Sequence, residues 1–127
     1  MTRVWLIALA GALGTLTRYG IGLWAGKTFG ANFPFGTLIV NIVGCFLIAA
    51  ITHVALSTEL ISPTVRLTLT TGFMGGLTTY SSFNLETTRF FQSRAWSAGF
   101  VNFGATTVGC FLAGLLGFVI ARRVFGP

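Results

Sequence analysis

Residues 70–86 read TTGFMGGLTTYSSFNLE. The surrounding segment is apolar enough to enter a membrane, yet this run carries a Gly-Gly pair, six Thr or Ser hydroxyls, an Asn and a carboxylic acid. Unpaired polar groups are costly in hydrocarbon, so irregular backbone and polar side chains at that depth are expected where they face protein or a water-filled path. Residues 70–86 are therefore the first candidate for a functional segment.

The rest of the chain has the composition of an integral membrane protein. Of its 127 residues, 54% are hydrophobic and 8% are charged, whereas about 25% are charged in a typical soluble domain. Since about 20 apolar residues cross the hydrocarbon, the long runs with few charges predict four membrane helices. Their approximate bounds are 4–25, 35–56, 66–91 and 96–121, in a single all-α domain covering residues 1–127.

The third of these helices is predicted to be broken. Gly72, Gly75 and Gly76 each weaken a helix by about 1 kcal/mol relative to Ala, so we expect a break near Gly75 to Thr79. A broken membrane helix exposes carbonyl oxygens where its first half ends and N–H groups where its second half begins, which suits a small ion. The alternative is a continuous helix in which Gly72 and Gly76 serve close packing.

Positive charge is nearly balanced between the two ends of the predicted helices. With four spans, both termini and the loop around residues 57–65 share one side. That side carries Arg3, Arg66, Arg122 and Arg123, and the other carries Lys27, Arg89 and Arg94. Because excess positive charge normally selects the cytoplasmic side, this balance favours an antiparallel, dual-topology homodimer. The alternative is a single orientation that other features select.

The remaining composition excludes several classes of protein. A net charge of +6 fits anionic lipid or an anionic substrate, and nothing resembles the soluble basic face of a nucleic-acid-binding protein. One His and two acidic residues provide no metal cluster and no nucleophile–base pair, so an enzyme is not expected. The start of the chain imitates a signal peptide, but the apolar pattern continues beyond Arg18 and favours a membrane helix.

Polar side chains interrupt the first two predicted helices. Arg18 lies about two turns before the end of the first helix, where it either reaches the interface and bonds loop carbonyls or contacts a substrate. In the second helix, Thr37 and Asn41 stand one turn apart and share a face. The amide of Asn41 can donate N–H groups to an anion or bond a neighbouring helix, and the sequence favours neither role.

The second half of the third helix combines aromatic and polar side chains. Tyr80 and Phe83 share one face, and Ser82 and Glu86 lie on a neighbouring one with the hydroxyl of Thr79. The positive edge of an aromatic ring can favour a small anion where little water is present. Glu86 is interpreted either as a proton or ion relay, or as a carboxyl held neutral or paired with a cation at the helix end.

The fourth helix carries a polar stripe at four-residue spacing, which includes Asn102, Thr106 and Cys110. The stripe predicts either a pore wall or interhelical hydrogen bonds. Cys110 and the other cysteine, Cys45, both fall inside predicted helices. They are interpreted as small buried residues in preference to a disulfide or a metal site.

Three motifs resemble those of the Fluc, or CrcB-type, fluoride channels of microbes. They are GTLTR at 14–18, GTLIVN at 36–41 and GFMGGLTTYSSFNLE at 72–86. The third motif is long and specific, and the resemblance covers essentially the whole chain in length, helix number and motif order. It implies a passive, selective channel that exports fluoride across the bacterial plasma membrane, built as an antiparallel homodimer with two pores and a structural Na⁺ at its centre.

The resemblance also implies roles for individual residues. Asn41 would bond fluoride, Tyr80 and Phe83 would present ring edges along the pores, and backbone carbonyls of Gly75 and Thr78 would bind Na⁺. The other matched positions are Arg18 near a vestibule and, in or near the pore lining, Thr37, Ser81, Ser82, Glu86, Thr106 and Cys110. The family more often has Phe at position 80 and Ser at position 110.

Two other classes of membrane protein remain as alternatives. A small proton-coupled multidrug exporter can also have four helices and dual topology, but it needs an acidic residue in the middle of its first helix, where this chain has Arg18. A non-transporting membrane assembly subunit would use its glycines for packing only. Such a subunit would tolerate Asn41→Ala and Phe83→Ala.

Overall fold

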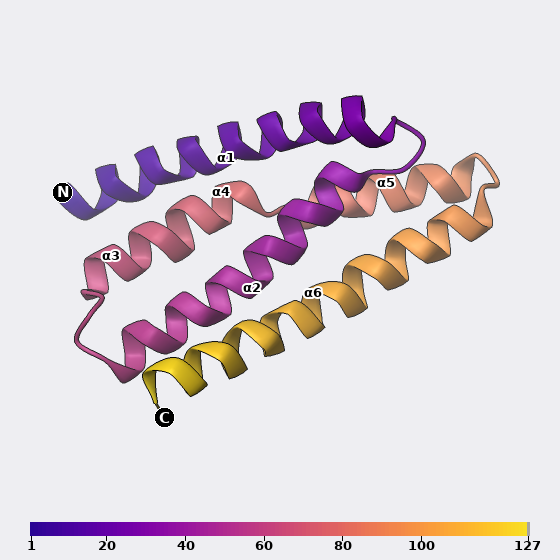
Figure 1. Cartoon of the computed structure of the whole chain (residues 1–127). Helices are drawn as coiled ribbons and strands as arrows, with labels where there is room; N and C mark the ends of the chain where they lie inside the picture. The colour runs from indigo at the N-terminus through magenta and orange to yellow at the C-terminus, as the bar shows by residue number, and fades with distance from the viewer. Residues whose placement is uncertain (127) are drawn as a thin grey trace.

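Three long helices form the frame of the fold. A computed structural model describes residues 1–126, and within them the chain is entirely helical apart from its connections (Figure 1). The long helices are α1 (Thr2–Phe29), α2 (Phe35–Ser57) and α6 (Trp96–Phe125). Each is long and apolar enough to cross a membrane. Helices α1 and α6 extend about a turn beyond the ends that the sequence predicted.

The remaining segment consists of four short pieces that follow one another. They are α3 (Pro63–Leu67), the π-helical η1 (Thr68–Met74), α4 (Gly75–Leu77) and α5 (Tyr80–Gln92). Together they run from one end of the bundle to the other, while both termini and the α2–α3 connection lie at the same end (Figure 1). Helix α1 packs on η1 and α4, whereas α6 packs on α2 and α5.

The predicted break in the third helix is confirmed at Thr78 and Thr79. Both residues have extended backbone, with φ −85° and ψ 155° at Thr78 and φ −154° and ψ 114° at Thr79. The Oγ1 atom of Thr79 accepts a hydrogen bond of 3.1 Å from the backbone N–H of Ser82. Thr79 is thus the N-cap of α5, a position that Thr favours because its hydroxyl satisfies a free helix N–H group. The break therefore follows the glycines.

Glycines bring α1 into backbone contact with the first half of the broken segment. A Cβ atom added at Gly14 would overlap the carbonyl of Phe73, and one added at Gly76 would overlap the carbonyl of Gly11. At Gly72 the added atom would lie 2.9 Å from the carbonyl oxygen of Ile7. Small residues allow such close helix contacts in membranes. The packing role considered for Gly72 and Gly76 is therefore present together with the break.

The first half of this segment is not the regular α-helix that the sequence predicted. Residues Thr68–Met74 form π-helix, a rare form that is often found at functional sites. The hydroxyls of Thr68 and Thr70 donate to carbonyls four residues earlier, at 2.9 and 2.8 Å. These bonds satisfy both hydroxyls inside an apolar environment.

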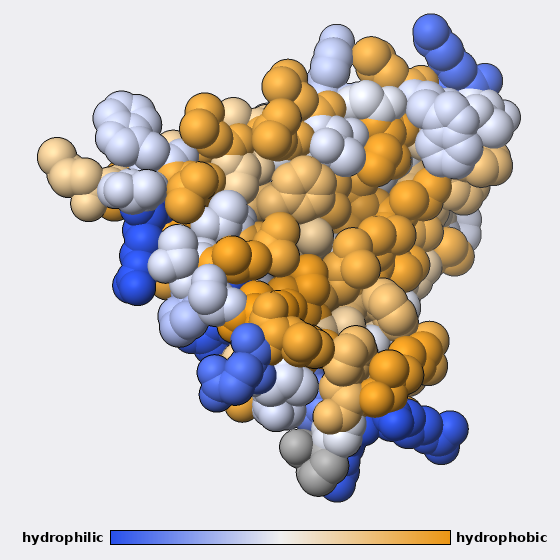
Figure 2. Space-filling view, turned by 60° about the vertical axis from the view of Figure 1, so that its left-hand side comes forward, coloured by the Kyte–Doolittle hydropathy of each residue, from blue (hydrophilic) through white to orange (hydrophobic). Residues whose placement is uncertain are grey.

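The outer surface of the bundle is apolar. Figure 2 shows a broad hydrophobic area over the middle of one face, with the most hydrophilic residues toward its edges. Large side chains such as Leu13 of α1 and Phe111 of α6 are exposed, whereas the buried cluster is small and centres on Val40, Met74 and Leu77. A soluble protein would bury such side chains, so this distribution is that of an integral membrane protein.

Candidate functional site

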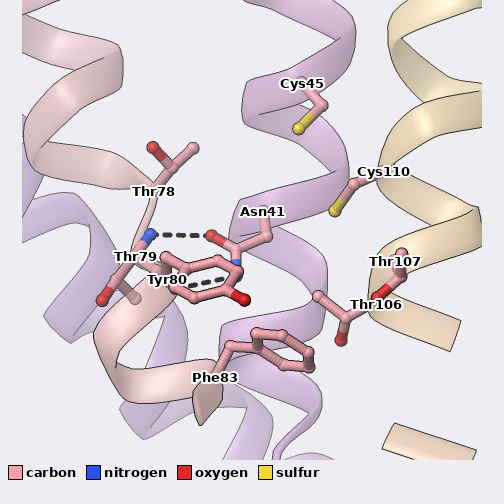
Figure 3. Close-up of a pocket in the computed structure, with 9 residues that line it drawn as sticks. All are labelled: Asn41, Cys45, Thr78, Thr79, Tyr80, Phe83, Thr106, Thr107 and Cys110. Carbon is pink, nitrogen blue, oxygen red and sulfur yellow. Dashed lines mark hydrogen bonds between the residues drawn. The ribbon is translucent and has the colours of Figure 1, made fainter. Parts of the chain in front are cut away.

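Asn41 closes the break in the backbone. Its Oδ1 atom accepts a hydrogen bond of 2.7 Å from the N–H of Thr79, and its Nδ2 atom donates one of 3.0 Å to the carbonyl of Thr79 (Figure 3). The side chain is buried, with 7% of its surface exposed. The structure thus shows the interhelical role of the amide. A primary amide has two N–H donors, so one remains for another ligand.

A cavity of about 280 Å³ lies beside this pair, and we call it the break cavity. Residues from α2, α5, α6 and the break itself line it (Figure 3). They are Asn41, Cys45, Thr78, Thr79, Tyr80, Phe83, Thr106, Thr107 and Cys110. The cavity therefore brings together five of the pore residues predicted from the sequence, namely Asn41, Tyr80, Phe83, Thr106 and Cys110.

The two predicted aromatic residues differ in their surroundings. Phe83 is buried, with 4% of its surface exposed, and its ring lies 6.2 Å from that of Phe103 in a stacked arrangement. Tyr80 is 77% exposed, and its ring meets that of Phe83 edge to face at 5.5 Å. Phe83 is therefore a fixed part of the cavity wall, whereas Tyr80 projects outward from this single chain.

Thr106 provides a hydroxyl without a protein partner. Its Oγ1 atom is buried, and within residues 1–126 it makes no hydrogen bond. A buried polar atom without a partner costs about 1–3 kcal/mol, so this hydroxyl is available to a ligand or water in the break cavity. No Lys or Arg lines this cavity. Its polar groups are neutral amides, hydroxyls and thiols.

A second cavity, of about 470 Å³, collects other predicted residues, and we call it the Arg18 cavity. Arg18 lines it together with Thr37 and Ser82, and Thr79 borders both this cavity and the break cavity. Seven of the nine predicted pore residues, all except Ser81 and Glu86, are therefore divided between these two cavities. The break in the third segment lies between them.

Glu86 lies farther along the broken segment and bonds α2. Its Oε1 atom accepts a hydrogen bond of 2.6 Å from the Thr37 hydroxyl, while its Oε2 atom is buried and has no partner within the described residues 1–126. Glu86 lines a third cavity, of about 440 Å³, with Arg89 and Asn32. Thr37 thus connects the Arg18 cavity with the cavity around Glu86.

The predicted metal ligands lie at the end of the first half-helix. In a continuous helix the N–H of Thr79 would bond the carbonyl of Gly75, but here it bonds Asn41. The carbonyls of Gly75 and Thr78 belong to the last turn before the break, where helix carbonyls lack intrahelical partners. Gly75 is exposed and Thr78 is half-buried. The Oγ atom of Ser81, also exposed, lies 3.2 Å from that of Thr79.

Known proteins match this chain over almost its full length. The family model described as CrcB-like protein, Camphor Resistance (CrcB), matches residues 5–118. The chain belongs to the CrcB family. It is 56% identical over 124 residues to the fluoride-specific ion channel FluC of Sorangium cellulosum (strain So ce56), a match that covers 98% of both chains. It is 43% identical over 126 residues to the FluC of Anaeromyxobacter sp. (strain K), covering 99% of this chain and all of the relative.

Three residues of this CrcB-family site were not among the predicted ones. Thr79, Cys45 and Thr107 all line the break cavity. Cys45 stands one turn after Asn41 on α2, so helical spacing from Asn41 could have indicated it. Thr79 had been grouped with other hydroxyls, but its role depends on a contact with a residue 38 positions away. Thr107 follows the predicted Thr106, and no periodic signal distinguishes it.

Proposed function

We propose that this CrcB-family chain is a passive, fluoride-selective channel that lets fluoride leave the cell through the bacterial inner membrane. The chief observation in support is the break cavity, in which the Asn41–Thr79 pair stands among neutral hydrogen-bond donors and aromatic rings. The relatives from Sorangium cellulosum and Anaeromyxobacter, each a fluoride-specific ion channel FluC, agree with it. The family is one of ion channels and not of enzymes.

Fluoride is small and strongly hydrated, so a channel must replace its water with several donors at once. The second N–H of Asn41 and the hydroxyl of Thr106 can supply two, and the edge of the Phe83 ring adds a favourable field. Since the cavity has no fixed cation among its lining residues, the ion would be bound without being trapped. Thr79, which borders both cavities, offers a route from the break cavity to the Arg18 cavity.

The working unit in this proposal is an antiparallel homodimer in which each chain crosses the membrane four times. Ser81, Asn84 and Thr88 are exposed on α5 at a spacing that places them on one face, next to the exposed Tyr80. Polar side chains at membrane depth are expected to face protein or water. A second copy would cover this face, and the balance of positive charge supports insertion in both orientations.

The dimer centre would hold a structural Na⁺. The carbonyl oxygens of Gly75 and Thr78 suit this use, because oxygen atoms are the ligands of hard cations and the break leaves these carbonyls without helix partners. Two carbonyls per chain are few for a cation site. Two copies that meet at Gly75 would provide four, which supports a site shared between chains.

The first expected result is selective fluoride efflux from proteoliposomes. Liposomes containing the purified protein and loaded with potassium fluoride should release fluoride rapidly once a potassium ionophore balances charge, as recorded with a fluoride electrode. Liposomes loaded with potassium chloride should release almost no chloride. Phe83→Ile should reduce fluoride efflux, because an aliphatic side chain has no positive ring edge.

Silence for both ions in monodisperse, folded protein would exclude the channel and favour the assembly subunit. Transport of a cationic drug driven by a proton gradient would favour the exporter, although α1 carries no acidic residue.

The second expected result concerns removal of Na⁺. Protein purified and reconstituted in potassium salts without sodium should show a lower dimer fraction in membrane cross-linking and a lower rate of fluoride efflux. Both should recover when Na⁺ is added back. Na⁺ is smaller than K⁺ and therefore suits a site made of a few close carbonyl oxygens. Equal dimer fraction and equal efflux in the two salts would refute the Na⁺ site and leave the channel proposal intact.

A further inference from the structure

The two cysteines of the chain lie together. Cys45 is on α2 and Cys110 is on α6, and both line the break cavity (Figure 3). Both also line a second hollow, of about 350 Å³, together with Ile48 and Phe111. The packed helices α2 and α6 thus each contribute one thiol to the same two hollows.

Close packing of α2 and α6 fixes the approach of the two thiols. A Cβ atom added at Gly114, one turn after Cys110, would lie 3.7 Å from the carbonyl oxygen of Cys45. Farther along, one added at Gly117 would overlap the carbonyl of Phe46. The two helix backbones are therefore in near contact beside the cysteine pair, in the turns of α6 that follow Cys110. Both cysteines are free and half-buried, so the cavity gives a reagent access to them.

We propose that Cys45 and Cys110 form a two-coordinate binding site for a soft divalent cation, with Hg²⁺ as the representative ion. Thiolates are soft ligands, which select soft metals over Mg²⁺ or Ca²⁺. A structural zinc site needs four protein ligands, whereas residues 1–126 contain no cluster of three or more His, Cys, Asp or Glu side chains. Two thiols suit an ion that accepts linear coordination.

The charge of the product also favours a divalent ion. Neutral mercuric chloride reacts with two thiols by breaking two S–H and two Hg–Cl bonds and forming two Hg–S bonds. Two protons and two chloride ions leave, and no atom is oxidised or reduced. The resulting dithiolate complex is neutral, so it avoids the desolvation cost of a charge in a low-dielectric site. A monovalent ion such as Ag⁺ would leave one negative charge there.

Occupancy of this site should stop ion flow, an expectation that rests on the proposed function. Cys45 lies one turn from Asn41 on the same helix face, and Cys110 lies one turn from Thr106. A metal held between the two sulfur atoms would therefore occupy the part of the break cavity next to the fluoride donors.

Binding can be tested without reference to transport. Purified full-length protein is titrated with mercuric chloride while ultraviolet absorbance of the mercury–thiolate bond and the number of free thiols are recorded. We expect one metal ion per chain and two thiols lost per ion. A competing monothiol should remove the metal from Cys45→Ala or Cys110→Ala at concentrations on the order of 100-fold lower than from the unmodified protein, because one of two linked ligands is missing.

Several results would contradict the proposed metal site. One is the loss of only one thiol per bound ion. Another is removal of the metal from the unmodified protein and from the single variants at the same concentration of competing monothiol. A third is a metal-linked dimer in mass spectrometry under denaturing conditions. The double variant Cys45→Ala/Cys110→Ala serves as the matched control and should bind no mercury. Size-exclusion profiles establish that each variant is folded before it is compared.

Efflux measurements then test the blocking effect. Mercuric chloride should reduce fluoride efflux through the unmodified protein to the leak rate of liposomes without protein. A dithiol should then restore the efflux. The double variant should conduct at the same rate with and without mercuric chloride. If the metal binds with the expected stoichiometry but efflux continues, the blocking role is excluded. If the unmodified protein binds the metal but conducts no fluoride before the metal is added, the proposed function fails while the dithiol site remains.

Discussion

Replacement of Asn41 by Asp is expected to abolish fluoride efflux. The two side chains have nearly the same size, but a carboxylate cannot donate to the carbonyl of Thr79, so the 3.0 Å bond across the break is lost. An ionised carboxylate would also place a negative charge beside the cavity proposed for an anion. Two like charges about 4 Å apart repel by about 4 kcal/mol at an effective dielectric constant near 20. That energy corresponds to roughly a 10³-fold lower occupancy by fluoride.

The proteoliposome assay measures this effect directly. Asn102→Asp is the matched control, because Asn102 is the other deeply buried amide and bonds Thr87 at 2.9 Å, away from the residues that line the break cavity. We expect the control to lose stability but to retain fluoride efflux. Efflux at the unmodified rate from folded Asn41→Asp protein would show that Asn41 is not part of the ion path.

Gly76→Ala is expected to damage folding strongly. The added methyl group would overlap the carbonyl of Gly11 and lie 3.0 Å from the nitrogen of Thr15, so it meets backbone and not a movable side chain. Overpacking typically costs about 1–3 kcal/mol, and backbone contact places this case at the upper end. Because the same contact holds α1 against α4, we expect the yield of folded protein to fall together with its thermal stability.

A glycine in open space provides the comparison for this substitution. Gly20 is also in α1, and an added Cβ atom there would meet nothing within 4 Å. Gly20→Ala should therefore leave the protein unchanged or stabilise α1, by up to about 1 kcal/mol. Thermal unfolding in detergent, followed by size exclusion, measures both variants. Equal melting temperatures for Gly76→Ala and the unmodified protein would contradict the tight contact with α1.

Local patterns in the sequence were sufficient to predict the helices and the break. Long apolar runs with few charges define α1, α2 and α6, and Gly72 together with the Gly75-Gly76 pair indicates a helix that breaks. The position of the break at Thr78 and Thr79 follows from the N-cap preference of Thr. The π-helical turns of η1 left no such signal, because their hydrogen bonding differs from that of an α-helix without any change in the apolar pattern.

Contacts between distant segments could not be derived from such patterns. The sequence allowed Asn41 two roles, and only the position of α2 against the break shows which one the amide has within the chain. The pairing of Cys45 with Cys110 depends on the register of α2 against α6, and the periodicity of the sequence does not predict that register. The division of the predicted residues among separate cavities has the same origin, since α2 presents Thr37 and Asn41 to different cavities.

The bond between Asn41 and Thr79 has a consequence for the biogenesis of the protein. Two half-helices with extended backbone between them are unstable when surrounded only by lipid. The backbone N–H and C=O groups of Thr79 would have no hydrogen-bond partner there. Helix α2 precedes the break in the chain, so the amide of Asn41 is synthesised before Thr79. Residues 63–92 would therefore enter the bilayer as a pair with α2 and not as an independent insertion unit.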